Sequence, residues 1–455
     1  MPSRFFAVLS TLLVWLFFDA VGISQTKPNT PGKKTAAPAK PLPVKLPAIS
    51  LKAPTEPAMK VAPVDRTSRA AAIDAAGKID AILEKSWKEL RTKSQPSLRE
   101  EQFLRRVYLE LGGRIPTYDE ASKFLTSRSK DKRPDLIDSL LESPDYVSHF
   151  YNYWANVFRL CERPQNNIVL DPYLAYVKEK IADGKVSNAF QQLVRANQYA
   201  VRVNKRELKL PHDYAYSDAK PDDIVKPKVL WGSVPSSASK ADRREQFAAW
   251  VVSREDRQFA RNIANRIWKK MMGLGIVEPV DDFKADNKPS NPELLEHLTD
   301  EVLRLNFDIR ELVRIIANTQ TYQKLAMVHD PSATEPYPFA APVLHRMTAE
   351  QIWDSLLILV AYNPWAYQRP TAKEIAAVVD LELAKVKLDD AEKSAANFES
   401  TFFLPKYNRD LQKLCGYKGQ LLVRASEILA PLPLGHFLRQ FGQSDREGAF
   451  PSCDP

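Results

Sequence analysis

Apolar residues recur every three or four positions through most of the chain, the spacing that places them on one face of an α-helix. Between Ile73 and Leu90 they form a single stripe, and between Tyr146 and Phe158 the stripe is largely aromatic. An aromatic stripe at this spacing is typical of a packed core rather than of a ligand site. The pattern therefore predicts a mainly α-helical protein.

Capping signals divide this pattern into separate helices. A Ser or Thr followed three residues later by Glu or Gln forms a capping box, in which two side chains satisfy backbone N–H groups at the helix start. Capping boxes are predicted at Ser97 with Glu100, at Thr117 with Glu120 and at Thr348 with Gln351, and single N-caps at Ser143, Asn291 and Asp308. Gly112 and Gly113 are expected to end the helix before them.

Regions without helical periodicity set the predicted domain boundaries. Residues 206–242 are rich in Pro and Asp, so we expect a linker there between a first helical domain at 73–205 and a second at 243–447. Residues 371–398 have the charged pattern of an exposed helix. Residues 23–72 carry nine prolines among Ala and Lys residues, which predicts a disordered tether.

The N-terminus predicts export. The 14-residue apolar run FFAVLSTLLVWLFF follows a short basic segment and precedes small residues at Ala20 and Gly22, as in a secretory signal peptide, here 1–22. The run is shorter than the about 18 residues of a membrane span, so cleavage is favoured over a retained anchor. We expect a protein of the periplasm or cell envelope, with no membrane span after cleavage.

The net charge of +9 lies mostly in the tether. Residues 25–72 hold nine Lys and Arg against Glu56 and Asp65, which is +7 of the +9. The rest of the chain is nearly neutral, so no nucleic-acid partner is expected. The tether is interpreted as a spacer, with attraction to anionic surface polymers as the alternative.

The sequence lacks the motifs of common catalytic and cofactor sites. It contains no GxGxxG, P-loop, GxSxG or HExxH pattern. Its three cysteines, Cys161, Cys415 and Cys453, form no CxxC or CxxCH motif, which excludes a covalent haem motif and allows one disulfide at most. No cofactor is evident from the sequence.

The helix FARNIANRIWKK carries a polar strip. Arg261, Asn265 and Arg266 fall on one helical face. A buried guanidinium needs a partner, and Asp281 and Asp282 in the next connection are the predicted ones. This interpretation makes the strip a structural ion-pair network that locks a loop to a helix.

The same acidic loop, EPVDDFKADNKPSNPE, also has a functional interpretation. Its carboxylates at Asp281, Asp282 and Asp286 offer oxygen ligands to a hard cation such as calcium, without matching a DxDxDG loop. In this interpretation the candidate binding residues are those of the strip and of LHRMTAEQIWD together with Asp286, namely Arg261, Asn265, Arg266, His345, Arg346 and Asp354. Glu350 in LHRMTAEQIWD is a candidate catalytic residue. Glu350 with Asp281 or Asp282 would form a carboxylate pair for glycosidic-bond hydrolysis, unless Glu350 pairs with Arg346 and Asp354 faces water.

Long stretches of the chain carry a family resemblance. EQFLRRVYLELGGRIPTYDEASKFL and RPDLIDSLLESPDYVSHFYNYWANVFRL resemble the first of two adjacent domains of unknown function in large exported planctomycete proteins, often described as cytochrome-associated. REQFAAWVVSREDRQFARNIANRIWKKMMGLGIVEPVDDF, SNPELLEHLTDE, TQTYQ and HRMTAEQIWDSLL resemble the second, and LVRASEIL and GHFLRQFGQSDRE its later part. The resemblance implies export, a mostly helical build, and links to cytochrome-type modules, sulfatase-like envelope proteins and polysaccharide use. It assigns no catalytic residue.

Two departures from the family pattern shape the functional hypothesis. The CxxCH-like segment common late in the first domain is absent, and the chain ends soon after FGQSDRE, so residues 448–455 are expected to be a truncated tail. We interpret the chain as an exported binding or scaffolding protein in cell-envelope polysaccharide handling. The alternative is a carbohydrate-active hydrolase using a carboxylate pair. An electron-transfer component comes third, because the haem motif is absent.

Overall fold

The structure, a computed structural model, describes most of the chain beyond residue 60. The described residues are 61–160, 171–185, 187–188, 208–225, 228–236, 243–329, 336–361, 364–365, 369, 416–417, 420–428, 432 and 435–443. Several predictions lie outside them: the signal peptide at 1–22, the tether as far as residue 60, the exposed helix at 371–398, the tail at 448–455, and Cys161, Cys415 and Cys453.

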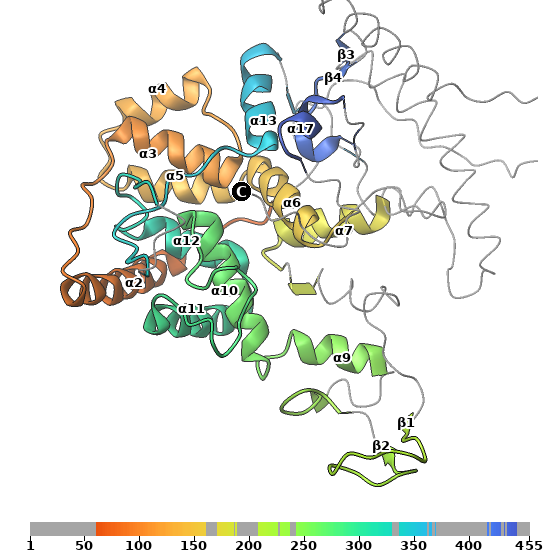
Figure 1. The fold of residues 1–455 in the computed structure, drawn as a ribbon. Coiled ribbons are helices and arrows are strands. Elements are labelled where there is room, and N and C mark those ends of the chain that lie inside the picture. The colour runs from red at the N-terminus through yellow and green to blue at the C-terminus, as the bar shows by residue number, and fades with distance from the viewer. Residues whose placement is uncertain are drawn as a thin grey trace, which may run out of the picture. The chain divides into compact units, whose positions relative to one another are not determined.

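The described chain is mainly α-helical, as the apolar pattern predicts (Figure 1). Its first part contains η2 (Arg66–Ser68), α2 (Arg69–Glu89), α3 (Glu100–Val107), the π-helical turn η3 (Tyr108–Gly112), α4 (Tyr118–Thr126), α5 (Lys132–Leu141), α6 (Pro144–Val157) and α7 (Asp171–Ala182). Its second part contains α9 (Arg243–Val251), α10 (Arg257–Met272), α11 (Pro292–Arg304), α12 (Ile309–Asn318), α13 (Ala349–Val360), η6 (Ala425–Glu427) and α17 (Phe437–Gln440).

Two short antiparallel strand pairs complete the described elements. β1 (Leu208–Lys209) pairs with β2 (Ile224–Val225), with Leu208 opposite Val225. β3 (Gly416–Tyr417) pairs with β4 (Gln420–Leu421), with Gly416 opposite Leu421. Among the described helices none combines the length and the apolar character needed to cross a membrane.

Most of the predicted helix starts are confirmed. The capping boxes form at Thr117 and Thr348, and the single caps at Ser143, Asn291 and Asp308. The box predicted at Ser97 is wrong, because α3 begins at Glu100 with Arg99 as its N-cap. Ser97 instead forms an isolated β-bridge with Lys324, so its backbone is extended where a cap would need to turn into the helix.

The two predicted helical domains share one hydrophobic core. Ile79, Phe103 and Trp154 from the first part and Trp268 and Ile316 from the second are buried in the same cluster. α10 packs against α11, and α12 packs against both α2 and α5 (Figure 1). Apolar burial therefore stabilises both parts together, and the segment at 206–242 does not separate two independently packed bodies.

A buried carboxylate ties the N-terminal part of the described chain to α12. Asp138 on α5 accepts hydrogen bonds from Arg314 Nε at 2.8 Å and from Arg69 Nε at 3.0 Å. The side chains of Arg314 and Asp138 are 0% and 1% exposed. Two guanidinium groups on one buried carboxylate compensate the cost of removing these charges from water.

The helical body begins earlier than residue 73. α2 begins at Arg69, Val64 is buried, and the backbone N–H of Val64 donates to Glu142 at 3.0 Å. Arg314 also donates to the backbone carbonyl of Asp65 at 3.0 Å. The predicted boundary between the disordered tether and the first helical domain, at residue 72, is therefore too late. The Pro-rich composition of the segment gives no indication that single residues such as Val64 and Asp65 contact the helical body.

Replacing Asp138 tests this buried ion cluster. Asp138→Asn leaves the buried Arg314 without a full counter-charge, so we expect the free energy of unfolding to fall by about 3–5 kcal/mol. Asp135→Asn is the matched control, because Asp135 also pairs with Arg69 but its side chain is 49% exposed, and should cost less than about 1 kcal/mol. Denaturant unfolding measures both free energies. Equally small losses of stability in the two variants would contradict the stabilising role of the buried ion cluster.

Candidate functional site

The acidic loop after α10 is held by Asn265, whose side chain is fully buried. Its amide nitrogen donates to the carbonyls of Val277 at 2.9 Å and Val280 at 2.8 Å. Its amide oxygen accepts from the N–H groups of Ile276 at 2.7 Å and Val277 at 3.1 Å. All of these contacts are with backbone, so Asn265, predicted as a binding residue, fixes the loop instead.

The predicted pairing of the polar strip with the acidic loop is partly confirmed. Arg266 forms an ion pair with Asp281, which also accepts from Asn262 at 2.8 Å. Arg261 does not reach the loop, because its guanidinium pairs with Glu296 on α11 at 2.5 Å. The ion pairs of the strip therefore extend to α11 as well as to the loop.

The carboxylates of the loop are not gathered as metal ligands. Asp282 pairs with Lys284 at 3.0 Å, and Asp286 is exposed. Within the part of the chain that the structure describes, no three His, Cys, Asp or Glu side chains are placed to hold a metal ion. The loop that offered a calcium site is thus organised by ion pairs and hydrogen bonds.

Two substitutions compare the buried Asn265 with Asp282, whose ion pair with Lys284 is solvent-exposed. Asn265→Ala leaves buried backbone groups without partners, so we expect the free energy of unfolding to fall by about 2–4 kcal/mol. Asp282→Asn removes only an exposed ion pair and should change it by less than about 1 kcal/mol. Chemical denaturation measures both, and a larger loss for Asp282→Asn than for Asn265→Ala would refute this account of the loop.

A pocket lies between the α3–η3 segment and the segments before α13. Its volume is about 370 Å³, within the range of about 300–1,000 Å³ typical of small-molecule sites. The lining comprises Leu98, Gln102, Arg105, Arg106, Leu109, Glu110, Met271, Leu325, Ala326, Pro342, Val343, Leu344, His345, Arg346, Met347 and Gln351. The predicted binding residues His345 and Arg346 therefore line the same pocket.

His345 contacts two acceptor groups in this pocket. Its Nε2 lies 3.1 Å from a carboxylate oxygen of Glu110, and its Nδ1 lies 3.2 Å from the carbonyl oxygen of Val343. Both partners are acceptors, so both ring nitrogens donate only in the imidazolium form. The hydrogen bond to Glu110 raises the pKa of His345 against the opposing effect of its partial burial.

Two of the three arginines in the pocket wall have uncommitted guanidinium groups. Arg105 and Arg346 are exposed, and the structure gives neither an ion pair nor a hydrogen bond with any described residue. Arg106 differs, since it donates to the carbonyls of Tyr322 and Lys324 at 2.6 Å each. Arg106 therefore supports the wall, whereas Arg105 and Arg346 are free to bind an anion.

The π-helical turn η3 brings Glu110 to the pocket. η3 continues α3 with a wider turn and ends at Gly112, and the next residue, Gly113, has a left-handed φ of 69°. Single π turns inside helices are frequent at functional sites. Gly113 is required here, because a Cβ at this position would lie 2.6 Å from Nδ1 of His149. Glu110 was missed by sequence reasoning, although an acidic residue inside the apolar run VYLELGG was an available signal.

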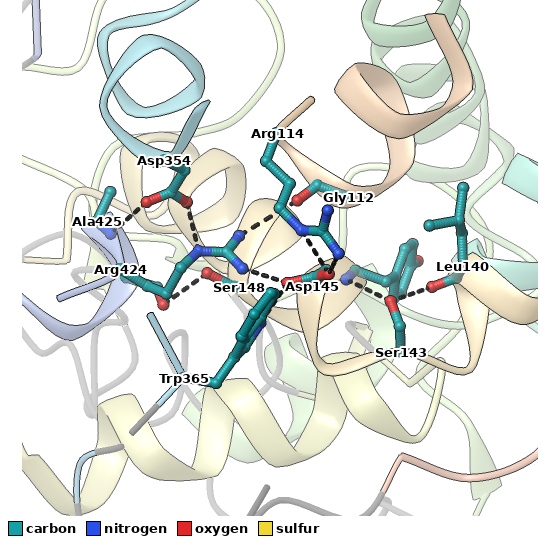
Figure 2. Close-up of polar contacts among 12 residues, drawn as sticks. Gly112, Arg114, Leu140, Ser143, Asp145, Ser148, Asp354, Trp365, Arg424 and Ala425 are labelled. Atoms are coloured by element: carbon teal, nitrogen blue, oxygen red, sulfur yellow. Dashed lines mark hydrogen bonds and ion pairs between the residues drawn. The ribbon is translucent and has the colours of Figure 1, made fainter. Parts of the chain in front are cut away.

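A buried ion network fixes α13, the helix that follows His345 and Arg346. Figure 2 shows the carboxylate of Asp145 between the guanidinium groups of Arg114 and Arg424. Arg424 Nε also donates to Asp354 on α13 at 2.8 Å. Burial opposes ionisation of Asp145, but Arg424 and Arg114 hold its pKa below the usual value. For Asp354 burial outweighs Arg424 and raises the pKa.

The carboxylates predicted on α13 have structural partners. Asp354 is buried against Arg424 and accepts from the N–H of Ala425 at 2.9 Å, so it does not face water. Glu350 is buried and accepts from Gln443 at 3.2 Å. Gln351 donates to the carbonyl of Leu109 at 2.9 Å, which joins α13 directly to η3. The described contacts bring Glu350 neither to Arg346 nor to the acidic loop.

Comparison with protein families finds two adjacent matches. Residues 78–226 match the model PSCyt2, described as a protein of unknown function (DUF1549). Residues 243–401 match PSD1, described as a protein of unknown function (DUF1553). Comparison with curated proteins and with solved structures gives no match. The pocket thus takes one wall from the DUF1549 segment and the other from the DUF1553 segment.

Proposed function

We propose that this chain, which carries a DUF1549 domain followed by a DUF1553 domain as is typical of planctomycete cytochrome-associated proteins, is a binding protein for anionic ligands. The observation that carries the proposal is the pocket with two uncommitted guanidinium groups, Arg105 and Arg346, beside the imidazolium of His345. Glu110 offsets one of these positive charges, which leaves the pocket with a net positive charge.

Sulfate and carboxylate groups suit this arrangement. A guanidinium forms paired hydrogen bonds with planar or tetrahedral oxyanions. The apolar part of the wall, including Leu109, Met271 and Val343, can pack against the carbon skeleton that carries the anion. We therefore favour a sulfated or uronic-acid polysaccharide of the cell envelope, with export as an accompanying proposal. Sulfatase-like and cytochrome-type envelope proteins remain proposed partners.

The pocket favours binding over hydrolysis. In the imidazolium form both ring nitrogens of His345 donate to Glu110 and Val343, so the ring has no lone pair to act as a base. The carboxylates of the alternative hydrolase, Asp281 and Asp282 with Glu350, have other partners. The ligand-binding interpretation uses Arg105, Arg346 and His345 and requires no such pair.

Replacing Arg346 tests the proposal. Arg346→Gln removes one free guanidinium, and we expect the dissociation constant for dextran sulfate to rise about tenfold, the loss of one charge-assisted contact. Arg128→Gln is the matched control, because Arg128 is also exposed but does not line the pocket. Titration calorimetry measures both variants, with uncharged dextran as the ligand control. Equal affinities for Arg346→Gln and Arg128→Gln would place the anion elsewhere.

Binding should also weaken as the pH rises. The pKa of His345 is raised, so its cation persists above the ordinary value of about 6.5 and is lost as the pH passes the raised value. Affinity for dextran sulfate should fall across that window in the wild type and fall less in His345→Gln, where only the nearby Lys270, with its pKa of about 8, still titrates.

The same titration affects folding stability. A raised folded-state pKa means that the His345–Glu110 pair stabilises the fold below about pH 6.5, and that this contribution is lost as the pH rises through the folded-state pKa. Lys270 titrates nearby, with a pKa lowered to about 8, so the comparison between wild type and His345→Gln isolates the histidine. A stability difference independent of pH would show that the ion pair does not form.

A further inference from the structure

Behind the pocket, Lys270 of α10 occupies an aromatic environment. Its Nζ lies 5.0 Å from the ring centre of Phe150 and 5.0 Å from that of Tyr153, both on α6. Its hydrogen-bond partner is Nε2 of His149, at 2.8 Å. No carboxylate among the described residues lies within ion-pair distance of this amine, although Glu110 and Glu350 act on it from farther away.

A half-buried lysine without an ion pair is unusual, because lysines are rarely buried unless paired. Burial lowers the pKa of Lys270 to about 8, against the milder opposing effect of Glu110 and Glu350. About a tenth of the side chain is then the neutral amine at pH 7, far more than for an exposed lysine. The neutral amine is the nucleophilic form. Lysines desolvated in this way are the ones that form Schiff bases.

His149 is placed to accept a proton from this amine. Burial, followed by the charge of Lys270, holds the pKa of His149 well below its usual value, so the ring is neutral. A protonated amine can only donate, so across the 2.8 Å contact Nε2 of the neutral ring accepts from Lys270.

We propose that Lys270 is a reactive amine that forms a Schiff base with an aldehyde, with His149 as the neighbouring base. The neutral Nζ attacks the carbonyl carbon, a C–N bond forms, and the carbonyl electron pair moves to the oxygen. Nζ passes one proton to His149 Nε2, which returns it to the oxygen. The second Nζ proton then reaches the oxygen by the same route while the nitrogen lone pair forms the C=N bond and the C–O bond breaks, which releases water and leaves His149 neutral. The balance is one amine and one aldehyde giving one imine and one water.

The site differs from the anion pocket in its chemistry and its residues. Phe150 and Tyr153 provide apolar faces that suit an uncharged carbonyl compound, whereas the pocket presents Arg105 and Arg346. Lys270 keeps some contact with solvent, since the residue is only partly buried. A small aldehyde is therefore the class of reagent that we propose for this amine.

Reductive trapping tests the proposal on the folded protein. Acetaldehyde with cyanoborohydride converts each imine into a stable ethyl-lysine, which peptide mass spectrometry assigns to single lysines. At pH 7 we expect Lys270 to be modified about tenfold faster than the exposed Lys288, because more of its amine is neutral. The rate at Lys270 should level off above about pH 8, while the rate at Lys288 keeps rising.

Two variants test the roles of Lys270 and His149 separately. Lys270→Arg keeps a cationic donor to His149 and should remove the fast-reacting site without creating another. His149→Gln keeps a hydrogen-bond acceptor but not the imidazole base, so trapping at Lys270 should slow while that at Lys288 is unchanged. Modification of Lys270 no faster than that of Lys288 in the folded wild type, or with the same pH profile, would overturn the proposal.

Discussion

The buried carboxylate of Asp145 is the interaction on which the arrangement of this protein depends. It lies between the guanidinium groups of Arg114 and Arg424, and Arg424 also reaches Asp354 (Figure 2). Arg114 also pairs with Glu120, so the five residues form one chain of alternating charges. Removing such charges from water is costly unless each is paired. In this chain every charge is paired. The pairs join α4, α6, α13 and the start of η6, and so specify how these elements pack.

These ion pairs also determine where the residues of the candidate site lie. Asp354 fixes α13 through Arg424, and Gln351 of α13 bonds to the carbonyl of Leu109 in η3. The chain immediately before α13 then carries His345 and Arg346 to the side of α3 and Glu110. The two walls of the pocket come from two family domains, yet both belong to one core and are joined by buried polar contacts.

Local features of this fold were predictable, because they depend on neighbouring residues. The cap at Thr348 follows from the residue three positions later, and the pairing of Arg266 with Asp281 from helical spacing and the acidic loop beside it. Contacts between distant residues were not predictable. Glu110 meets His345 only after folding, and the sequence contains several arginines that satisfy the same charge requirement as Arg424.

The same limit explains why the acidic loop attracted a functional interpretation. Clustered carboxylates suggest metal ligands, yet such clusters also arise where a loop is fixed by ion pairs. The four contacts of Asn265 with the loop backbone support the second interpretation, and the cation site stays a prediction. The candidate site is instead the pocket lined by the unpaired guanidinium groups of Arg105 and Arg346.

Hydrogen exchange of the intact protein with and without dextran sulfate tests the central claim, that the ligand binds between the two domains. The account predicts slower exchange in peptides covering both 98–110 and 342–351, the two walls of the pocket. Uncharged dextran should leave both unchanged. Protection confined to one wall, or appearing only in another part of the chain such as 208–236, would contradict the account.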